Sequence, residues 1–120
     1  MNQTKSTNPE RIKLIRLLKK QSRENKTSIW LNIAKYLTKS QPQRTAVNLS
    51  KINRYTEKNE VVIVPGKVLG TGKLDHPVEL AAFSLSRKAK EKIKAAESKY
   101  LTIQELMEKN PKGKRIKLIK

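Results

Sequence analysis

The sequence contains no cysteine, which excludes disulfide bonds, thiolate zinc sites and a cysteine nucleophile. Its single histidine, His76, has only Asp75 and Glu79 as acidic neighbours in the sequence, so no pattern of metal ligands or of an acid–base pair forms around it. We interpret His76 as a solvent-facing loop residue. No apolar run approaches the ~18 residues that would span a bilayer, and the polar opening MNQTKSTNPE lacks the apolar segment of a signal peptide. We therefore expect no cofactor and no membrane association.

Acidic residues are also scarce. Asp and Glu total 10 against 28 Lys and Arg, which gives a net charge of +18 on 120 residues. So much charge of one sign on a chain of single-domain length repels itself and favours a polyanionic partner. The charge is uneven: residues 11–54 hold 12 bases and one acid, residues 109–120 hold six bases and no acid, and residues 57–79 hold three bases and four acids. We expect a flexible tail over residues 1–7 and a single domain over residues 8–120.

Two helices are expected first. Asn8-Pro9-Glu10 is typical of a helix start, because it combines a capping side chain, a proline and an acid near the positive end of the helix dipole. A second helix is expected from Ser28 to the residues before Pro42. On the first helix, leucines gather on one side, and four bases with no acid among them recur at i, i+3, i+7 and i+10 on another. These bases are Lys13, Arg16, Lys20 and Arg23.

The rest of the chain mixes short strands and helices, which predicts an α/β domain with a small sheet. Pro65-Gly66 is interpreted as a tight turn between two strands. Thr102 and Glu105 form the pattern of a capping box. The expected strands are 61–64, 67–69, 78–84 and 115–119, with a brief extended piece at 46–49; the expected helices are a short one capped by Ser50, one from Ser86 to about residue 98, and one at 103–109.

The segment Gly70-Thr71-Gly72-Lys73 superficially resembles a nucleotide-binding loop. A phosphate-binding loop would need Ser or Thr after the lysine and another glycine five positions before Gly72, and neither is present. The dinucleotide fingerprint fails as well, because Asp75 stands where its third glycine belongs. We interpret the segment as a glycine-rich turn that also lets the backbone approach an RNA phosphate, with Lys67 and Lys73 supplying charge.

Aromatic residues are few, and each could either pack in a core or stack on an unpaired base. Trp30 lies on the apolar side of its helix and Phe83 lies within a strand, so core packing is expected for both. Tyr55, next to Arg54, is the better candidate for stacking.

Four segments resemble a known family: TNPERIKLIRLLKK, VNLSKINRY, VVIVPGKVLGTG and NPKGKRIKLI. The chain is similar to large-subunit ribosomal proteins of the L-eighteen-e family, the archaeal and eukaryotic relatives of bacterial L-fifteen, and its short length resembles the archaeal members. The resemblance implies an irregular layered strand–strand–helix arrangement. It also implies a structural protein of the cytoplasmic ribosome that binds large-subunit rRNA, contacts neighbouring ribosomal proteins, takes no small-molecule substrate and performs no chemistry.

RNA contacts are expected at bases spread over several segments. The candidates are Lys13, Arg16, Lys20, Arg23, Lys26, Arg44, Lys51, Arg54, Lys67, Lys73, Arg87, Lys88, Lys112, Lys114 and Arg115. The alternative function is a basic DNA-binding or nucleoid-associated protein that uses the first two helices as a helix-turn-helix pair. Against it, the connection from Glu24 to Thr27 has no glycine, and the would-be reading helix carries only Lys35 and Lys39. An RNA-modifying enzyme would need a catalytic constellation, and the sequence offers none.

Overall fold

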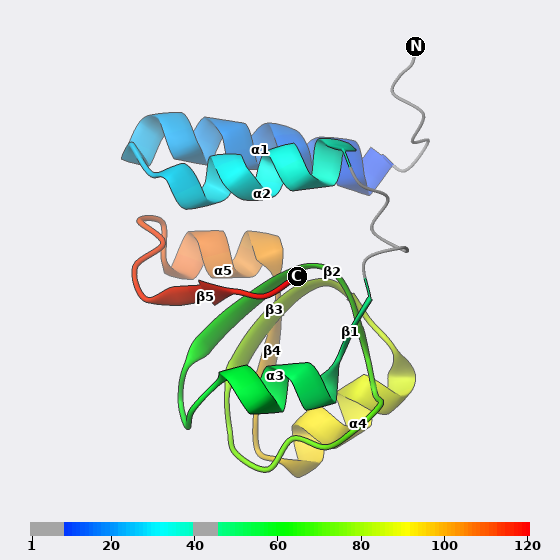
Figure 1. Cartoon of the computed structure of the whole chain (residues 1–120). Coiled ribbons are helices and arrows are strands. Elements are labelled where there is room, and N and C mark those ends of the chain that lie inside the picture. The colour runs from blue at the N-terminus through cyan, green and yellow to red at the C-terminus, as the bar shows by residue number, and fades with distance from the viewer. Residues whose placement is uncertain (1–8, 40–45) are drawn as a thin grey trace.

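The computed structural model describes residues 9–39 and 46–120 (Figure 1). In that part of the chain there are five helices and five strands. The helices are α1 (Pro9–Asn25), α2 (Ser28–Lys39), α3 (Leu49–Tyr55), α4 (Arg87–Ala95) and α5 (Ile103–Lys109), and the strands are β1 (Ala46–Asn48), β2 (Val61–Leu69), β3 (Glu79–Leu85), β4 (Lys99–Thr102) and β5 (Ile116–Leu118). Their order along the chain is α1-α2-β1-α3-β2-β3-α4-β4-α5-β5. The prediction of an α/β domain with two N-terminal helices is confirmed.

The strands form a single sheet in which every pairing is parallel. β2 is central: β3 lies along one edge, while β1 and β5 share the other edge, pairing with opposite ends of β2. β4 lies outside β3. Parallel strands need long crossovers, and α3, α4 and α5 provide three of them. The fourth crossover, residues 70–78, has no helix, but it buries Leu74 and Val78 under the sheet as a helix would bury its apolar face.

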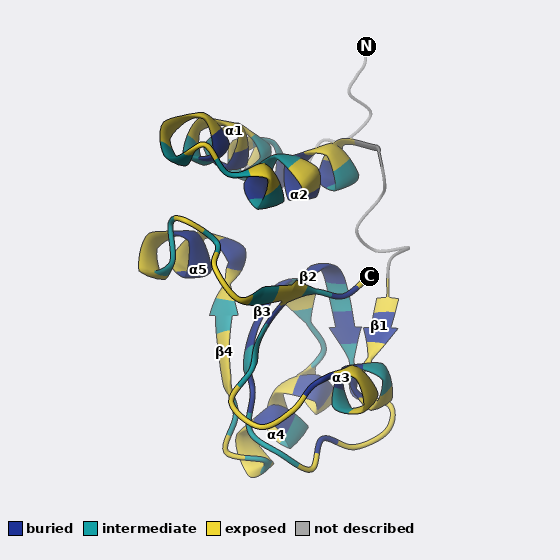
Figure 2. Ribbon diagram, turned by 60° about the vertical axis from the view of Figure 1, so that its left-hand side comes forward, coloured by how far each residue is buried: buried dark blue, intermediate teal, exposed yellow. Residues whose placement is uncertain are grey.

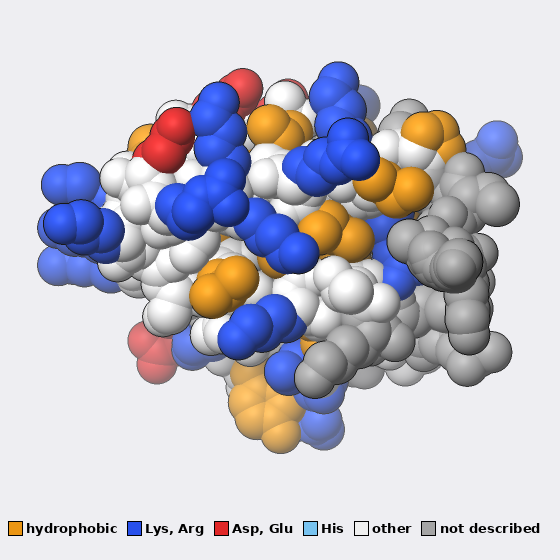
Figure 3. All heavy atoms as spheres, turned by 90° about the horizontal axis from the view of Figure 1, so that it is seen from above, with side chains coloured by type: hydrophobic (Ala, Val, Ile, Leu, Met, Phe, Trp, Pro, Cys, Tyr) orange, Lys and Arg blue, Asp and Glu red, His pale blue; other side chains and the backbone are white. Residues whose placement is uncertain are grey.

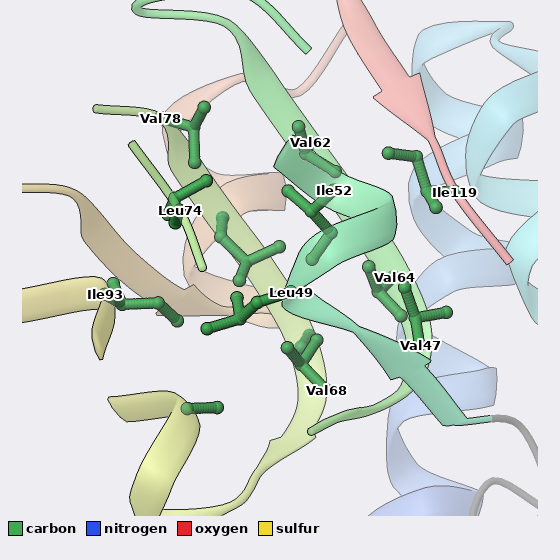
Figure 4. Packing of buried hydrophobic residues seen from close by; sticks show 13 residues of the cluster. Val47, Leu49, Ile52, Val62, Val64, Val68, Leu74, Val78, Ile93 and Ile119 are labelled. Atoms are coloured by element: carbon green, nitrogen blue, oxygen red, sulfur yellow. The ribbon is translucent and has the colours of Figure 1, made fainter. Parts of the chain in front are cut away.

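Helices cover both faces of the sheet. Figure 1 places α1, α2 and α5 on one side and α3 and α4 on the other. Because neighbouring residues of a strand point to opposite faces, Val62 and Val64 join a lower core with α3 and α4, and Ile63 joins an upper core with α1, α2 and α5. Figure 4 shows Leu49 and Ile52 of α3 directed at the strand residues of the lower core. Buried residues line the inward faces of these layers (Figure 2).

Three local predictions are wrong. Pro65 and Gly66 do not turn the chain, because β2 runs through them, and they lie where the register against β3 shifts between Val64 and Lys67. A proline lacks the N–H that a regular ladder needs, and an irregularity of this kind tolerates its absence. The positive-φ glycines are Gly72 and Gly113, so Gly66 needs no left-handed backbone.

The other two errors concern a helix start and a strand. α3 begins at Leu49 with Asn48 at its cap position, two residues before the expected Ser50. Strand β4 was not expected at all, because its sequence KYLT is short and largely exposed. The capping box is confirmed: the Thr102 hydroxyl accepts from the Glu105 N–H at 3.0 Å, and the Glu105 carboxylate accepts from the Thr102 N–H at 2.8 Å.

Candidate nucleic-acid interface

Helix α1 carries the basic stripe that its sequence predicts. Lys13, Arg16, Lys20 and Arg23, here called the α1 stripe, are all exposed, while Leu18 on the opposite side is fully buried. None of the four forms a hydrogen bond or an ion pair within the described residues. The stripe is therefore available to an outside partner.

The outer face of the α1–α2 layer extends this charge. Figure 3 shows Lys and Arg side chains across the face, with a few acidic side chains at its margin. Lys19 and Lys35 are exposed on the same two helices, although sequence reasoning did not select them as contacts. Between residues 11 and 38 Glu24 is the only acid against eight Lys and Arg residues, so most of the positive charge on these helices is unbalanced.

A second group of bases lies where α1 turns into α2. The indole N–H of Trp30 donates to the Pro111 carbonyl oxygen at 2.7 Å, which holds the loop between α5 and β5 against α2. Gly113 in that loop has φ +65°, and a Cβ there would lie 2.4 Å from Cγ2 of Ile29, so only glycine fits. The loop thus brings C-terminal bases beside those of the helical turn.

We call this group the basic end, and all of its members are exposed. It consists of Arg23, Lys26, Lys112, Lys114 and Arg115. Figure 3 shows a dense cluster of basic side chains at this end of the molecule, on the left of the view. In the sequence these residues form two separate clusters. The only signal that they lie side by side was Trp30, at the start of an otherwise ordinary amphipathic helix.

Arg11 is basic but serves the fold. The residue is 8% exposed, and its guanidinium donates from Nε to the Leu37 carbonyl oxygen at 2.9 Å, and from Nη2 to the same oxygen. Burial lowers the pKa of this guanidinium. The contact satisfies a carbonyl near the end of α2 and ties the two helices together. Arg11 stands seven residues before Leu18 and therefore on the apolar side of α1, so its burial could have been predicted from the sequence.

The Gly70–Gly72 loop is a turn held by the protein itself. Nζ of Lys92 donates to the carbonyl oxygens of Gly70 and Gly72 at 2.6 and 2.5 Å. A Cβ at Gly70 would lie 2.7 Å from Cβ of Lys88, and one at Gly72 would lie 2.4 Å from Cβ of Ser50. The glycines therefore allow the loop to pack against the first turns of α3 and α4.

Several predicted contacts surround this loop on the α3–α4 side. Lys73, Arg87 and Lys88 are exposed. Lys67 is half-buried and precedes Val68 of the lower core along β2, so its side chain points to the opposite face of the sheet. Arg87 and Lys88 occupy the first turn of α4, where the helix dipole disfavours positive charge by about 0.3–1 kcal/mol per residue. A bound phosphate would reverse that penalty.

The remaining predicted contacts lie on α3 or outside the described residues. Lys51 is half-buried and donates to the main-chain oxygen of Lys120 at 2.9 Å. The Arg54 guanidinium lies 5.2 Å from the centroid of the Tyr55 ring. Arg44 falls in residues 40–45, and the predicted N-terminal tail falls in residues 1–8, both outside the described part of the chain. Trp30 is fully buried and Phe83 packs against the upper core, so their expected core roles are confirmed.

His76 does not face solvent, contrary to the sequence interpretation. Its side chain is 17% exposed and bridges two partners, with Nδ1 2.9 Å from Oδ1 of Asp75 and Nε2 2.8 Å from the Thr56 hydroxyl. The Thr56 hydroxyl donates to the Ile52 carbonyl oxygen at 2.7 Å and is itself buried. The Asp–His–Thr series therefore links the 70–78 crossover to the end of α3, with the hydroxyl turned to its own helix.

No chemistry-bearing cluster stands out elsewhere in the described residues. Over residues 9–39 and 46–120, no three His, Asp or Glu side chains gather in a way that could hold a metal ion. No helix in these ranges has the length and apolarity that a membrane span requires. What the described surface offers is positive charge on two opposite sides.

The comparison with known proteins identifies the family. A profile described as "Ribosomal protein 60S L18 and 50S L18e" matches residues 1–120. The chain belongs to this family. It is 48% identical to the large ribosomal subunit protein eL18 of Methanothermobacter thermautotrophicus over 113 residues, which cover 94% of this chain and 93% of the relative.

Two further relatives agree. The eL18 proteins of Methanoregula boonei and Methanococcus maripaludis are 47% and 44% identical to this chain. The matches cover 95% and 99% of this chain, and 94% and 99% of the relatives. The resemblance inferred from the sequence segments is therefore confirmed, on its archaeal side.

Proposed function

We propose that this chain binds large-subunit rRNA mainly through the α1 stripe and the basic end, and that residues 8–120 act as one binding unit. Family membership makes the chain a structural constituent of the large ribosomal subunit in the cytoplasmic ribosome, with rRNA and neighbouring ribosomal proteins as its partners. Members of this family build the ribosome rather than catalyse a reaction.

The observation that carries the binding proposal is the unbalanced α1 stripe. Its four bases are exposed and pair with no carboxylate of the described chain, so in isolation they repel one another. Phosphates of RNA relieve this repulsion, and each neutralised phosphate releases a counterion. A helix in the wide, shallow minor groove of A-form RNA, or across its backbone, would contact phosphates and 2′-hydroxyls rather than base edges.

The bases on the α3–α4 side would serve a second rRNA segment. They are separated from the α1 stripe by the whole thickness of the sheet. Cations on two opposite sides let a single domain neutralise two RNA segments and lower the repulsion between them. The proposed contacts on this side are Lys51, Arg54, Lys73, Arg87 and Lys88. Lys67 on β2 is a further proposed contact, and Arg44 is proposed from the sequence alone.

The DNA-binding alternative loses its structural basis. Figure 1 shows α1 and α2 running side by side, whereas a helix-turn-helix pair crosses at a steep angle. In α2, the helix that would have to read the DNA, Trp30, Ile33 and Leu37 are packed in the upper core.

The binding proposal is tested by replacing Lys13, Arg16, Lys20 and Arg23 together with Gln and measuring rRNA affinity as a function of salt. We expect weaker binding and a salt slope that falls by roughly 0.7–0.9 for each lost phosphate contact. The matched control removes the same charge from exposed lysines that are not proposed contacts: Lys58, Lys90, Lys94 and Lys99. A slope that drops equally in both variants would mean that only net charge matters.

A sedimentation experiment places the chain in its assembly. After a high-salt wash, a tagged copy should still migrate with the large subunit, and the α1-stripe variant should be partly lost from it. A wild-type chain that stays in the light fractions would contradict the ribosomal role.

A further inference from the structure

An open hollow of about 320 Å³ lies between the end of α3 and the C-terminal strand. It is lined by Lys51, Tyr55, Lys117, Leu118, Ile119 and Lys120. Its size is at the lower end of the range for ligand sites, ~300–1,000 Å³, and suits one small planar group. The residues come from segments more than 60 positions apart, so the hollow exists only in the folded chain.

Tyr55 is the notable wall of this hollow. It is 53% exposed and is one of two large hydrophobic side chains that the described residues leave exposed. Leu118 and Ile119 supply apolar surface beside it, although Ile119 is itself buried in the lower core. An exposed aromatic ring next to an apolar floor gains free energy when another flat ring covers it.

Basic residues lie in and beside the hollow. The Arg54 guanidinium lies 5.2 Å from the ring centroid, and Nζ of Lys51 uses one of its three donors on the main-chain oxygen of Lys120. Nζ of Lys117 is 2.9 Å from the Tyr55 carbonyl oxygen and 3.1 Å from the Glu60 carboxylate, which offsets its charge. Lys51 and Arg54 therefore keep donors for an anion beside the ring.

We propose that this hollow takes one unstacked nucleotide of large-subunit rRNA, with its base on the Tyr55 ring and its phosphate at Lys51 and Arg54. The proposal rests on the proposed function, which makes rRNA the polyanion nearest to the chain. Single-stranded and bulged RNA is commonly recognised by a base on an aromatic side chain with a cation at its phosphate. The mixture of one aromatic ring, an apolar floor and unneutralised cations favours a nucleotide over a peptide segment.

The test uses assembled large subunits that carry the chain. Irradiation at 254 nm, followed by trypsin digestion and mass spectrometry, should show a nucleotide adduct on the peptide Tyr55–Lys58, because a stacked base reacts with the ring that it touches. Tyr55→Phe should keep the adduct, and Tyr55→Leu should abolish it and weaken rRNA binding by about ten-fold. Lys51→Gln should weaken binding less and lower the salt slope by about 0.7–0.9.

Tyr100→Leu is the matched control, since Tyr100 is the other exposed aromatic residue, at 44%, and lies on β4 away from the hollow. Adducts elsewhere in the chain with none on Tyr55, a peptide cross-linked to Tyr55 in place of a nucleotide, or equal effects of Tyr55→Leu and Tyr100→Leu would each overturn the proposal. Failure of the α1-stripe proposal would look different: the fourfold Gln variant would bind rRNA normally while the Tyr55 adduct remained.

Discussion

The two sides of the sheet use the same residue types for opposite purposes. On the α1–α2 side, the α1 stripe touches no protein partner in the described chain. On the α3–α4 side, several ammonium groups are bonded inside the protein: Lys92 to two loop carbonyls, Lys51 to the main chain of Lys120, and Lys117 to Tyr55 and Glu60. One side presents its charge, and the other uses much of it to hold loops in place.

This difference follows from what each side has to satisfy. Helices bond their own backbone, so side chains on the outer face of α1 have no carbonyl to serve. The α3–α4 side contains the helix-free crossover 70–78, whose carbonyls need donors, and a half-buried lysine such as Lys92 supplies them. A count of +18 therefore overstates the charge that is available for RNA.

The first prediction, with the largest expected effect, concerns the contact between Trp30 on α2 and the loop that carries Pro111. Trp30→Ala should lower the free energy of unfolding by about 3–5 kcal/mol, because it removes a fully buried ring and its bond to Pro111. Trp30→Phe should cost about 1–3 kcal/mol, since the ring is largely kept and the Pro111 oxygen loses its donor. Urea unfolding followed by circular dichroism measures both.

The same two variants sharpen the comparison between the sides. If the basic end depends on the docked loop, Trp30→Phe should also weaken rRNA binding while leaving the α1 stripe intact. Tyr100→Ala is the control, because this ring is 44% exposed and should cost little. Equal losses of unfolding free energy for Trp30→Ala and Tyr100→Ala would contradict the role given to the Trp30–Pro111 contact.

A second prediction pairs one lysine from each side. Lys92→Met should lower stability by about 1–2 kcal/mol, because two loop carbonyls lose a charged donor in a partly exposed site. Its effect on the salt dependence of rRNA binding should be small. Lys20→Met should do the reverse: stability within about 0.5 kcal/mol of wild type, and a salt slope lower by about 0.7–0.9. Calorimetry and filter binding across a salt series separate the two effects.

If both variants changed stability, or both changed the salt slope of rRNA binding, the distinction between the two sides would be contradicted. Lys94→Met provides the background value, since Lys94 is exposed on the same helix as Lys92 and its side chain forms no hydrogen bond or ion pair within the described residues.

Much of this arrangement could be read from the sequence, and the misses have physical causes. The stripe at i, i+3, i+7 and i+10 required only helical periodicity, and the capping box at Thr102 required only local hydrogen bonds. Pro65-Gly66 misled because the pair is typical of turns, whereas the pairing of the flanking residues Val64 and Lys67 with β3 keeps β2 extended through the pair. Tertiary contacts of that kind have no local signature.

The candidate site shows the same limit. The exposure of each α1 base was predictable from its position on the helix. The docking of the C-terminal loop on Trp30, the use of Lys92 as a loop donor, and the contact of His76 with Thr56 all join residues 20 or more positions apart. No spacing rule connects such pairs. The sequence therefore shows where the basic residues are, but not whether each is hydrogen-bonded inside the protein or free to bind RNA.

The smallest predicted effect is a pH dependence confined to the α3–α4 side. Hydrogen bonds from His76 and then Asn53 lower the pKa of Asp75, and the Glu57 N–H, followed by Lys117, lowers the pKa of Glu60. A carboxyl whose pKa is lower in the folded chain adds stability above its unfolded pKa and loses it as the pH falls through the folded value. The urea midpoint should therefore decline as the pH drops below the ordinary values of 4.5 for Glu60 and 3.8 for Asp75.

Asp75→Asn and Glu60→Gln should each flatten that decline, and the double variant should flatten it further. Glu91→Gln is the control, because this exposed carboxylate of α4 has no partner within the described residues. The α1 stripe has no carboxylate bonded to it, so the Gln-substituted stripe should follow the wild-type pH profile. If the stripe variant flattened the acid response as much as Asp75→Asn, the acid sensitivity would come from general charge repulsion. It would then not be a property of the α3–α4 side alone.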